Sequence, residues 1–228
     1  MFLYGIEPGI FGLYYTAWDL WHLGYPDQAL QKSKAACTLA QELSHPFSLA
    51  AARVFAAMSH QLRRERALTQ ECAEAAITLA REQGFPVWLG QGSVLQGWAL
   101  AEQGQTEEGI SQIRQGLATY QAIGAGIFQS YYLVLLAEAY GKAGRAEEGL
   151  AVLAEALTAV DKTEERFCEA ELYRIKGALM LESQVTGHKS HIEEAEECFL
   201  KAIEVAQRQQ AKSLELRATT GLARLWQK

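Results

Sequence analysis

A 40-residue repeat runs along most of the chain and constrains the possible folds more than any other feature of the sequence. The string at residues 104–110, Gly-Gln-Thr-Glu-Glu-Gly-Ile, returns 40 residues later, at residues 144–150, as Gly-Arg-Ala-Glu-Glu-Gly-Leu. The same step leads from Pro46 to Pro86. A fixed period of this length is typical of a protein built from stacked copies of one small structural unit.

Small residues occupy equivalent places in successive repeats. Such residues let two helices approach closely, while larger apolar neighbours fill the space between successive pairs. After Glu182 the register slips by six residues, which predicts a lengthened loop at residues 183–190. The three columns are Ala17, Ala57, Gly97, Ala137 and Gly177; Ala29, Thr69, Gly109 and Gly149; and Ala36, Ala76, Gly116 and Ala156, and they resume after the slip at Ala195, Ala202 and Ala223.

Each repeat contains two stretches with apolar residues at three- and four-residue spacing, the pattern of amphipathic helices. In the fourth repeat a turn at Gly144 separates them, and glycine readily adopts the left-handed conformation that ends a helix. The sequence therefore predicts an all-α fold without strands, made of five helix pairs of about 40 residues and a final helix. The predicted repeats are residues 12–44, 46–84, 86–124, 127–163 and 167–210, and the last helix is 213–227.

The pattern resembles the tetratricopeptide repeat (TPR), a match carried in the fourth repeat by Ala137, Tyr140, Gly144, Gly149 and Ala156. The resemblance implies a right-handed TPR-like α-solenoid spanning residues 1–228 as a single domain. The repeat departs from the family in length, since the usual TPR unit has about 34 residues. The second repeat also departs, because it has arginine at position 64 in place of the turn glycine.

Several longer strings are similar to the C-terminal repeat region of large bacterial signalling proteins. Those proteins join a cyclase or helix-turn-helix output domain to a central ATPase of the signalling NTPase class. The resemblance implies that this chain is the sensory or partner-binding arm of such a protein. The final helix lacks a pairing helix and the array starts abruptly, which predicts that the chain is a fragment of a larger protein. No cyclase or ATPase residues are present, so neither activity is expected here. The strings are residues 23–30, 43–48, 97–104, 136–144 and 170–174.

Charge and cysteine content exclude several other classes. A net charge of −6 without a block of like charge disfavours nucleic acid as a partner. No segment is long and apolar enough to span a membrane, and the N-terminus lacks a signal peptide, so the predicted location is cytoplasmic. The cysteines are widely spaced, which fits neither a disulfide framework nor a zinc site. They are Cys37, Cys72, Cys168 and Cys198.

Candidate chemistry along the chain is weak, and we expect no enzyme activity, cofactor or metal. The glycines at 124 and 126 lack the lysine of a phosphate-binding loop. His188 and His191 could ligate a metal, although a solvated loop explains them better. A cluster of arginines at positions 53, 63, 64 and 66 could hold an anion, although a solvated turn is the simpler interpretation. Paired glutamates at the start of second helices suit the helix dipole.

The inner face of the predicted solenoid is the better candidate for a binding site. In this repeat class it is lined by first-helix positions six and three before, and one and four after, the first small-residue column; we call these the inner positions. They change from aromatic residues in the first repeat to charged residues in the fifth. Trp18 is expected to be exposed and Trp21 partly buried. The alternative is that Trp18, Trp21 and Trp98 pack against neighbouring helices or a missing preceding domain. The candidate partner-binding residues are Tyr14, Trp18, Trp21, His22, Met58, Gln61, Trp98, Tyr131, Glu138 and Arg174.

Two functions fit this face. The first is a non-catalytic protein–protein interaction or regulatory module, whose groove accepts a helix or an extended peptide. The alternative is a solenoid that senses a small ligand, or inducer, stacked on the tryptophans, as in transcription-activator-like ATPases. The expected partners are a protein or peptide, including other domains of the same polypeptide, with self-association through the solenoid ends as a further possibility.

Overall fold

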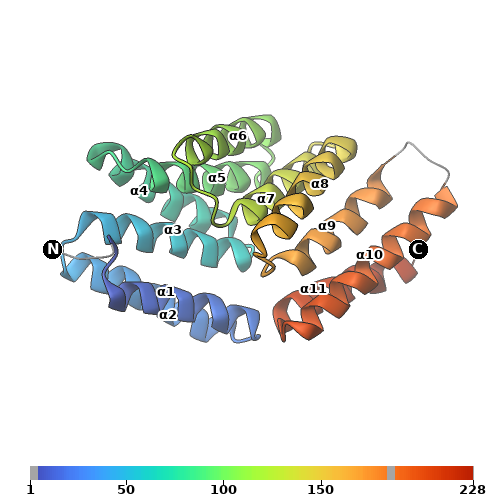
Figure 1. Ribbon diagram of the computed structural model, residues 1–228, viewed down its shortest axis with the longest axis horizontal. Coiled ribbons are helices and arrows are strands. Elements are labelled where there is room, and N and C mark those ends of the chain that lie inside the picture. The colour runs from blue at the N-terminus through green and yellow to red at the C-terminus, as the bar shows by residue number, and fades with distance from the viewer. Residues whose placement is uncertain (1–4, 184–187, 228) are drawn as a thin grey trace. The chain divides into compact units, whose positions relative to one another are not determined.

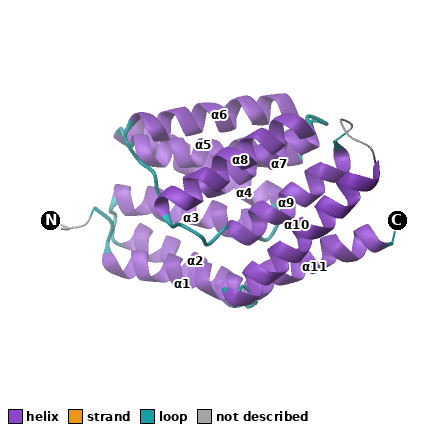
Figure 2. Cartoon of the chain, turned by 45° about the vertical axis from the view of Figure 1, so that its right-hand side comes forward, coloured by secondary structure: helices purple, strands orange, loops and turns teal. Residues whose placement is uncertain are grey.

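The described residues form eleven α-helices and no strand (Figures 1 and 2). A computed structural model describes residues 5–183 and 188–227, except for the side chains of residues 188–190. The prediction of five helix pairs and a final helix is confirmed. The helices are α1 (Pro8–His22), α2 (Pro26–Glu42), α3 (Pro46–Leu62), α4 (Arg66–Gln83), α5 (Pro86–Glu102), α6 (Thr106–Ala122), α7 (Gln129–Lys142), α8 (Ala146–Thr163), α9 (Glu169–Glu182), α10 (His188–Arg208) and α11 (Lys212–Trp226).

Helix starts follow from the placement of proline. Pro8, Pro26, Pro46 and Pro86 each occupy the first position of a helix, where the missing backbone donor leaves no hydrogen bond unmade. The first helix therefore begins at Pro8, four residues before the predicted start of the repeat. α10 begins at His188, so residues 188–190, predicted as loop, belong to a helix instead. Residues 184–187 of that segment lie outside the described part.

The ends of the helices also follow the repeat period. In each helix pair, the second helix is followed by a residue in the left-handed conformation. This residue is Gly84 after α4 and Gly124 after α6, with φ of 68° and 71°. The equivalent residues Ser44, Glu164 and Gln210 adopt φ of 49°, 58° and 57° without being glycine. A side chain with a Cβ is strained there by about 1 kcal/mol or more, so the repeat geometry dictates the conformation even where the sequence does not favour it.

We expect Glu164→Gly to raise the free energy of unfolding by about 0.5–1 kcal/mol. The substitution relieves the left-handed strain at an exposed residue, and the greater backbone freedom of glycine in the unfolded chain offsets part of the gain. Chemical denaturation followed by circular dichroism measures the change. The matched reverse substitution, Gly124→Ala, should lower stability by a similar amount because it introduces the same strain. A loss of stability in Glu164→Gly would contradict the explanation.

Two compact units divide the chain, residues 1–126 and 127–228, here called the N-terminal and C-terminal units. Each has two layers. In the N-terminal unit the first helices α1, α3 and α5 contact one another in order, and α2, α4 and α6 cover them. In the C-terminal unit α7, α9 and α11 form the equivalent layer of first helices, and the second helices α8 and α10 pack against it (Figure 1, yellow-green to red).

Contact between paired helices is closest where the small-residue columns meet. A Cβ added to Gly97 of α5 would lie 2.6 Å from the carbonyl oxygen of Gly109 in α6. One added to Gly116 would lie 2.7 Å from the carbonyl oxygen of Gly90. Real Cβ atoms do not approach an oxygen so closely, so glycine at these positions sets the separation of α5 and α6.

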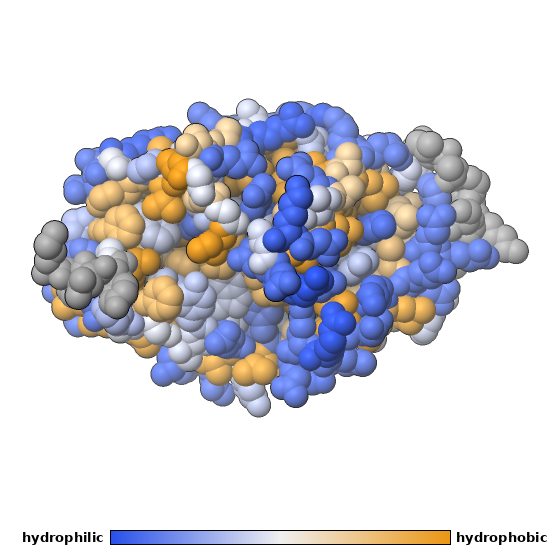
Figure 3. Space-filling view, viewed as in Figure 1, coloured by the Kyte–Doolittle hydropathy of each residue, from blue (hydrophilic) through white to orange (hydrophobic). Residues whose placement is uncertain are grey.

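Apolar side chains on the visible surface lie in separate patches among hydrophilic ones (Figure 3). Scattered apolar residues of this kind are normal for a folded protein surface. None of the helices in the described residues combines the length and apolarity that crossing a bilayer requires.

Candidate functional site: the inner face of the C-terminal unit

Charged side chains gather on the inner positions of α7, α9 and α11. Glu138 is on α7, Glu171 and Arg174 are on α9, and Arg217 is on α11. Because these first helices lie side by side in one layer, residues far apart in sequence come within reach of one another. The C-terminal unit therefore has a polar inner face. A face that is covered by other helices is usually apolar, so these charged residues distinguish the inner face from a buried one.

A network of ion pairs links these four residues. The guanidinium of Arg174 donates from Nε and Nη2 to the two carboxylate oxygens of Glu171, both at 2.8 Å. Arg217 Nη1 donates to the same carboxylate at 3.0 Å. Glu138 Oε1 lies 3.8 Å from Arg174 Nη2. A bidentate arginine–carboxylate pair fixes both side chains in one geometry, so Arg174 is held rigidly at the centre of the face.

The network is largely sequestered from solvent. The side chains of Glu171, Arg174 and Arg217 are 11%, 17% and 20% exposed. Charges this far from water must compensate one another, and two carboxylates facing two guanidiniums meet that requirement. The network orders the face without leaving a net charge on it.

Two adjoining pockets open beside Arg174. The larger has a volume of about 320 Å³ and is lined by Arg174, Ala178, Leu181, Glu182, Phe199, Gly221, Arg224 and Leu225. The smaller, of about 250 Å³, is lined by Glu138, Gly141, Lys142, Arg174, Ile175, Ala178, Leu179 and Glu182. Arg174, Ala178 and Glu182 belong to both, so the pockets are neighbours along one groove. Recessed volumes with a few charged groups on an apolar lining are typical of recognition sites.

Of the predicted binding residues, Glu138 and Arg174 are brought together in this groove. Arg217, Arg224, Lys142 and Glu171 are missing from the predicted set. The first two could have been found by applying the same inner positions to the final helix. Six residues before Ala223 is Arg217, and one after it is Arg224.

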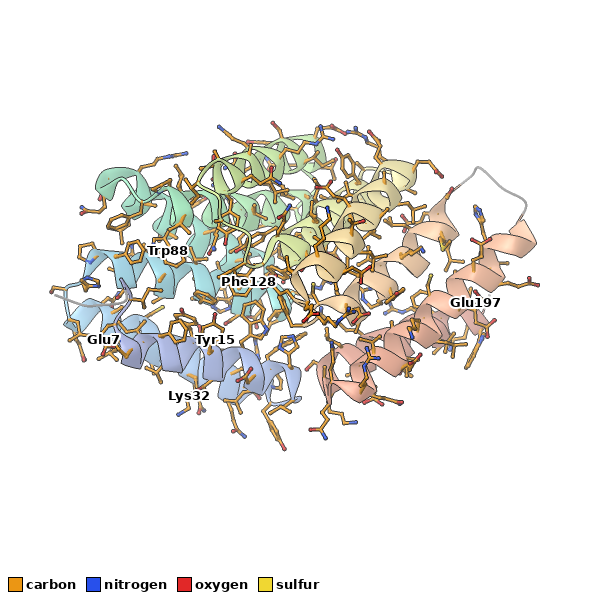
Figure 4. All side chains as sticks on the ribbon, in the orientation of Figure 1. Glu7, Tyr15, Lys32, Trp88, Phe128 and Glu197 are labelled. Carbon is orange, nitrogen blue, oxygen red and sulfur yellow. The ribbon has the colours of Figure 1, made fainter. Side chains whose placement is uncertain are left out.

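The predicted aromatic residues of the N-terminal unit pack against their neighbours. Tyr14 stacks on Phe55 with ring centroids 3.7 Å apart, and Tyr15 lies beside them on the side of α1 that faces α3 (Figure 4). Trp18 stacks on His22, and His22 is also in edge contact with Trp21. Burial raises the pKa of Tyr14, whose side chain is 3% exposed, so its hydroxyl stays protonated.

The prediction that Trp18 is exposed is wrong. Trp18 is 9% exposed, because the rings of Phe55 and His22 lie against it. Trp21 is 5% exposed and Trp98 only 1%, with the guanidinium of Arg64 5.6 Å from the centre of the Trp98 ring. Stacking a ligand on these tryptophans would require the covering side chains to move.

The remaining predicted residues are also covered. Met58, Gln61 and Tyr131 are 1%, 2% and 5% exposed, whereas His22 is half-buried. His22 Nδ1 lies 3.0 Å from the Trp18 carbonyl oxygen, to which it donates in the tautomer that is protonated at Nδ1. Binding by this set stays a prediction, and its charged members in the groove are Glu138 and Arg174, whose side chains are 13% and 17% exposed.

The arginine cluster near the second turn is engaged within the N-terminal unit. Arg63 pairs with Glu65 at 2.8 Å and Asp27 at 3.3 Å, and Arg66 donates to the Glu102 carbonyl oxygen at 3.1 Å. These contacts favour the structural interpretation of the cluster over an anion site.

The cysteines are free thiols. Burial raises the pKa of Cys72 to about 11 and that of Cys168 to about 12, so both are protonated at neutral pH and poor nucleophiles. Among the described side chains no three metal-ligating groups cluster. The histidine at position 188 lies outside those side chains.

No protein-family model matches the chain. Over 224 residues it is 25% identical to an uncharacterized protein of Rhizobium meliloti (strain 1021), which covers 97% of this chain. The chain spans 21% of the length of that curated relative.

Solved structures agree on the architecture. A thermophilic TPR protein of Thermus thermophilus superimposes with a TM-score of 0.59, at 19% identity over 94% of this chain and 99% of that one. The fold of the present chain is therefore that of the tetratricopeptide-repeat proteins. The TPR-like expectation from Ala137, Tyr140 and Gly144 is thus confirmed at the level of fold.

Two further solved structures superimpose on most of the chain. The apo form of RapI matches with a TM-score of 0.61, at 10% identity over 97% of this chain and 85% of that chain. A signal-transduction ATPase with numerous domains and a TPR sensor, from Pyrococcus horikoshii, matches with a TM-score of 0.56. That match has 15% identity and covers 95% of this TPR-like chain and 33% of the ATPase.

Proposed function

We propose that this chain is a non-catalytic protein-interaction module with a regulatory role, and that the groove of its C-terminal unit binds a peptide segment. The observation that carries the proposal is the pair of adjoining pockets around Arg174, which lines both of them together with Ala178 and Glu182. Two recesses in series suit successive side chains of one segment, whether helical or extended. A rigid ion-pair network between them provides a preorganised surface, which lowers the entropic cost of binding.

The comparisons support a regulatory context for the proposal. One structure of similar fold is an ATPase whose TPR region is described as a sensor. Another, a Rap protein, was solved in complex with Competence and Sporulation Factor, with a TM-score of 0.60 and 11% identity. By analogy with these proteins, the chain would act as the partner-binding arm of a larger signalling protein in the cytoplasm. Analogy of fold alone does not transfer a function, so the groove itself must be tested.

The test is a selection of peptides from a random display library, followed by binding measurements on two matched variants. Ala178 lines both pockets, so Ala178→Trp should fill them and weaken the selected peptides by about tenfold or more, a change of about 1.4 kcal/mol. Ala151 is exposed on α8, in the opposite layer, so Ala151→Trp is expected to leave binding unchanged.

Circular dichroism and thermal denaturation establish that both variants remain folded before binding is compared. A library that yields no binding peptide would count against the proposal. So would selected peptides that bind Ala178→Trp as tightly as the unmodified chain.

A further inference from the structure

We infer that the larger pocket of the C-terminal unit recognises an apolar side chain next to a carboxylate, with Arg224 as the carboxylate's partner. The occupant is an internal peptide segment in which an aromatic or large aliphatic residue adjoins an aspartate or glutamate. This inference rests on the proposed function, since it names the chemistry of the segment that the groove would bind.

The floor of the larger pocket is apolar. Phe199 and Leu225 belong to a buried cluster, at 3% and 7% exposure, and Ala178 and Leu181 pack against it. A Cβ on Gly221 would lie 2.6 Å from Cε1 of Phe199, so the aromatic ring lies directly over the backbone of α11. Burying an apolar group against such a floor is favourable by about 25 cal/mol per Å² removed from water.

The size of this pocket limits what it can hold. Sites for drug-sized ligands have volumes of about 300–1,000 Å³, and 320 Å³ is at the lower end of that range. A volume of this size accommodates one large side chain or a ligand fragment of similar size. The apolar floor therefore selects for a single aromatic or aliphatic side chain.

The positive charge on the wall of the larger pocket comes from two arginines with different roles, Arg174 and Arg224. Arg174 is already committed to Glu171 through two hydrogen bonds. Arg224 is outside that network, and within the described residues it forms no hydrogen bond or ion pair. Its five N–H donors are therefore available, in a planar arrangement that matches the two oxygens of a carboxylate.

Neighbouring acidic groups do not cancel the preference of Arg224 for a carboxylate. Glu138 and Glu171 face Arg174 and Arg217, so the four charges of the network compensate. Glu182, the carboxylate among the residues that line the larger pocket, also lines the smaller pocket, where Lys142 is a second cation. An incoming carboxylate beside Arg224 would thus meet an unpaired cation, and charge-assisted hydrogen bonds of this kind are the stronger ones.

The adjoining smaller pocket favours a peptide over a free small acid. Because the two pockets share Arg174, Ala178 and Glu182, a chain that places one side chain in the larger pocket can continue into the smaller one. A small acid would use only the first. A peptide segment therefore gains contacts that the acid does not.

The test uses three acetylated and amidated hexapeptides, Gly-Ser-Phe-Glu-Ser-Gly and its variants with Phe-Gln and Ala-Glu at the centre. Capped ends remove terminal carboxylates, so any acid recognised is the glutamate. Binding to the full chain is followed by NMR through the backbone amide of Gly221 and the side chain of Arg224. We expect the Phe-Glu peptide to shift both signals saturably and to bind at least about fivefold more tightly than either variant, a difference of about 1 kcal/mol.

Two protein variants separate recognition by Arg224 from a general charge effect. Arg224→Gln should abolish the preference for Phe-Glu over Phe-Gln, whereas Arg81→Gln, at an exposed position in the N-terminal unit, should preserve it. Equal binding of the Phe-Glu and Phe-Gln peptides would overturn the inference, as would an intact preference in Arg224→Gln. Tighter binding of 3-phenylpropionate than of the Phe-Glu peptide would overturn it too, because the site would then be one for small acids.

Failure of this inference can be told apart from failure of the proposed function. Library-selected peptides that need Ala178 but show no preference for apolar–acidic pairs would leave peptide binding standing and remove the role of Arg224. An empty library selection would instead count against peptide binding itself.

Discussion

Gly97→Leu should lower the free energy of unfolding by about 3 kcal/mol or more. The added side chain begins with a Cβ that would lie 2.6 Å from the Gly109 carbonyl oxygen and 2.8 Å from the backbone nitrogen of Ile113. Both are backbone atoms of α6, so they cannot move aside as the end of a flexible side chain could. The two helices must separate along their length, which is more costly than ordinary overpacking of about 1–3 kcal/mol.

The matched control is Gly12→Leu in α1. Gly12 is an exposed helical glycine, and a Cβ there would meet no atom within 4 Å. Leucine has the higher helix propensity, so stability should stay the same or rise by up to about 1 kcal/mol. Chemical denaturation of both variants, followed by circular dichroism, measures the difference. A denaturation midpoint for Gly97→Leu that equals that of the unmodified chain would show that this contact does not limit the approach of the helices.

Small-residue columns predicted these contacts because close packing requires the same small residues in each copy of a repeat. The period placed Gly97, Gly109 and Gly116 at helix–helix contacts, and all three are there. Gly90 was missed. Its column is also small at Ala50, Ser130 and Ala170, but the first repeat has Ile10 there, which hides the pattern.

The residues with a left-handed backbone conformation illustrate a second limit of prediction from the sequence. The glycines at 104 and 144 predict a turn. The arginine at 64 adopts φ of 61° at the equivalent place, although its residue type does not favour a left-handed conformation. Tertiary packing of the paired helices imposes this conformation against the preference of the residue. A turn can thus be predicted from its period even where its own residue argues against it.

The candidate site could be predicted only in part, because the period identifies a face of a helix and not what covers that face. Glu138 and Arg174 were both predicted for the inner face and lie 3.8 Å apart, but their ion-pair network also includes Arg217, which follows the six-residue slip. Trp18 was placed on the correct helix face, yet Phe55 from the next repeat covers it. Pairing and exposure both depend on neighbouring repeats, which the pattern within one repeat does not contain.

The tryptophans provide the second large prediction: Trp98→Ala is expected to lower the free energy of unfolding by about 3–5 kcal/mol. Its side chain is 1% exposed, and truncation of a buried aromatic leaves a cavity that the surrounding helices only partly fill. The substitution also removes the ring beneath the Arg64 guanidinium, 5.6 Å away, which adds a smaller loss.

Trp226→Ala is the matched control, because Trp226 lies on α11 and is 65% exposed. It should lower stability by about 1 kcal/mol or less, chiefly through the lost hydrogen bond from its indole nitrogen to Glu196 Oε1, at 2.9 Å. Circular dichroism is the appropriate signal for both variants, since tryptophan fluorescence changes with the substitution itself. A small loss in Trp98→Ala, similar to that in Trp226→Ala, would mean that Trp98 is accessible. The tryptophans would then again be candidates for stacking a ligand, and the groove around Arg174 would no longer be the preferred site.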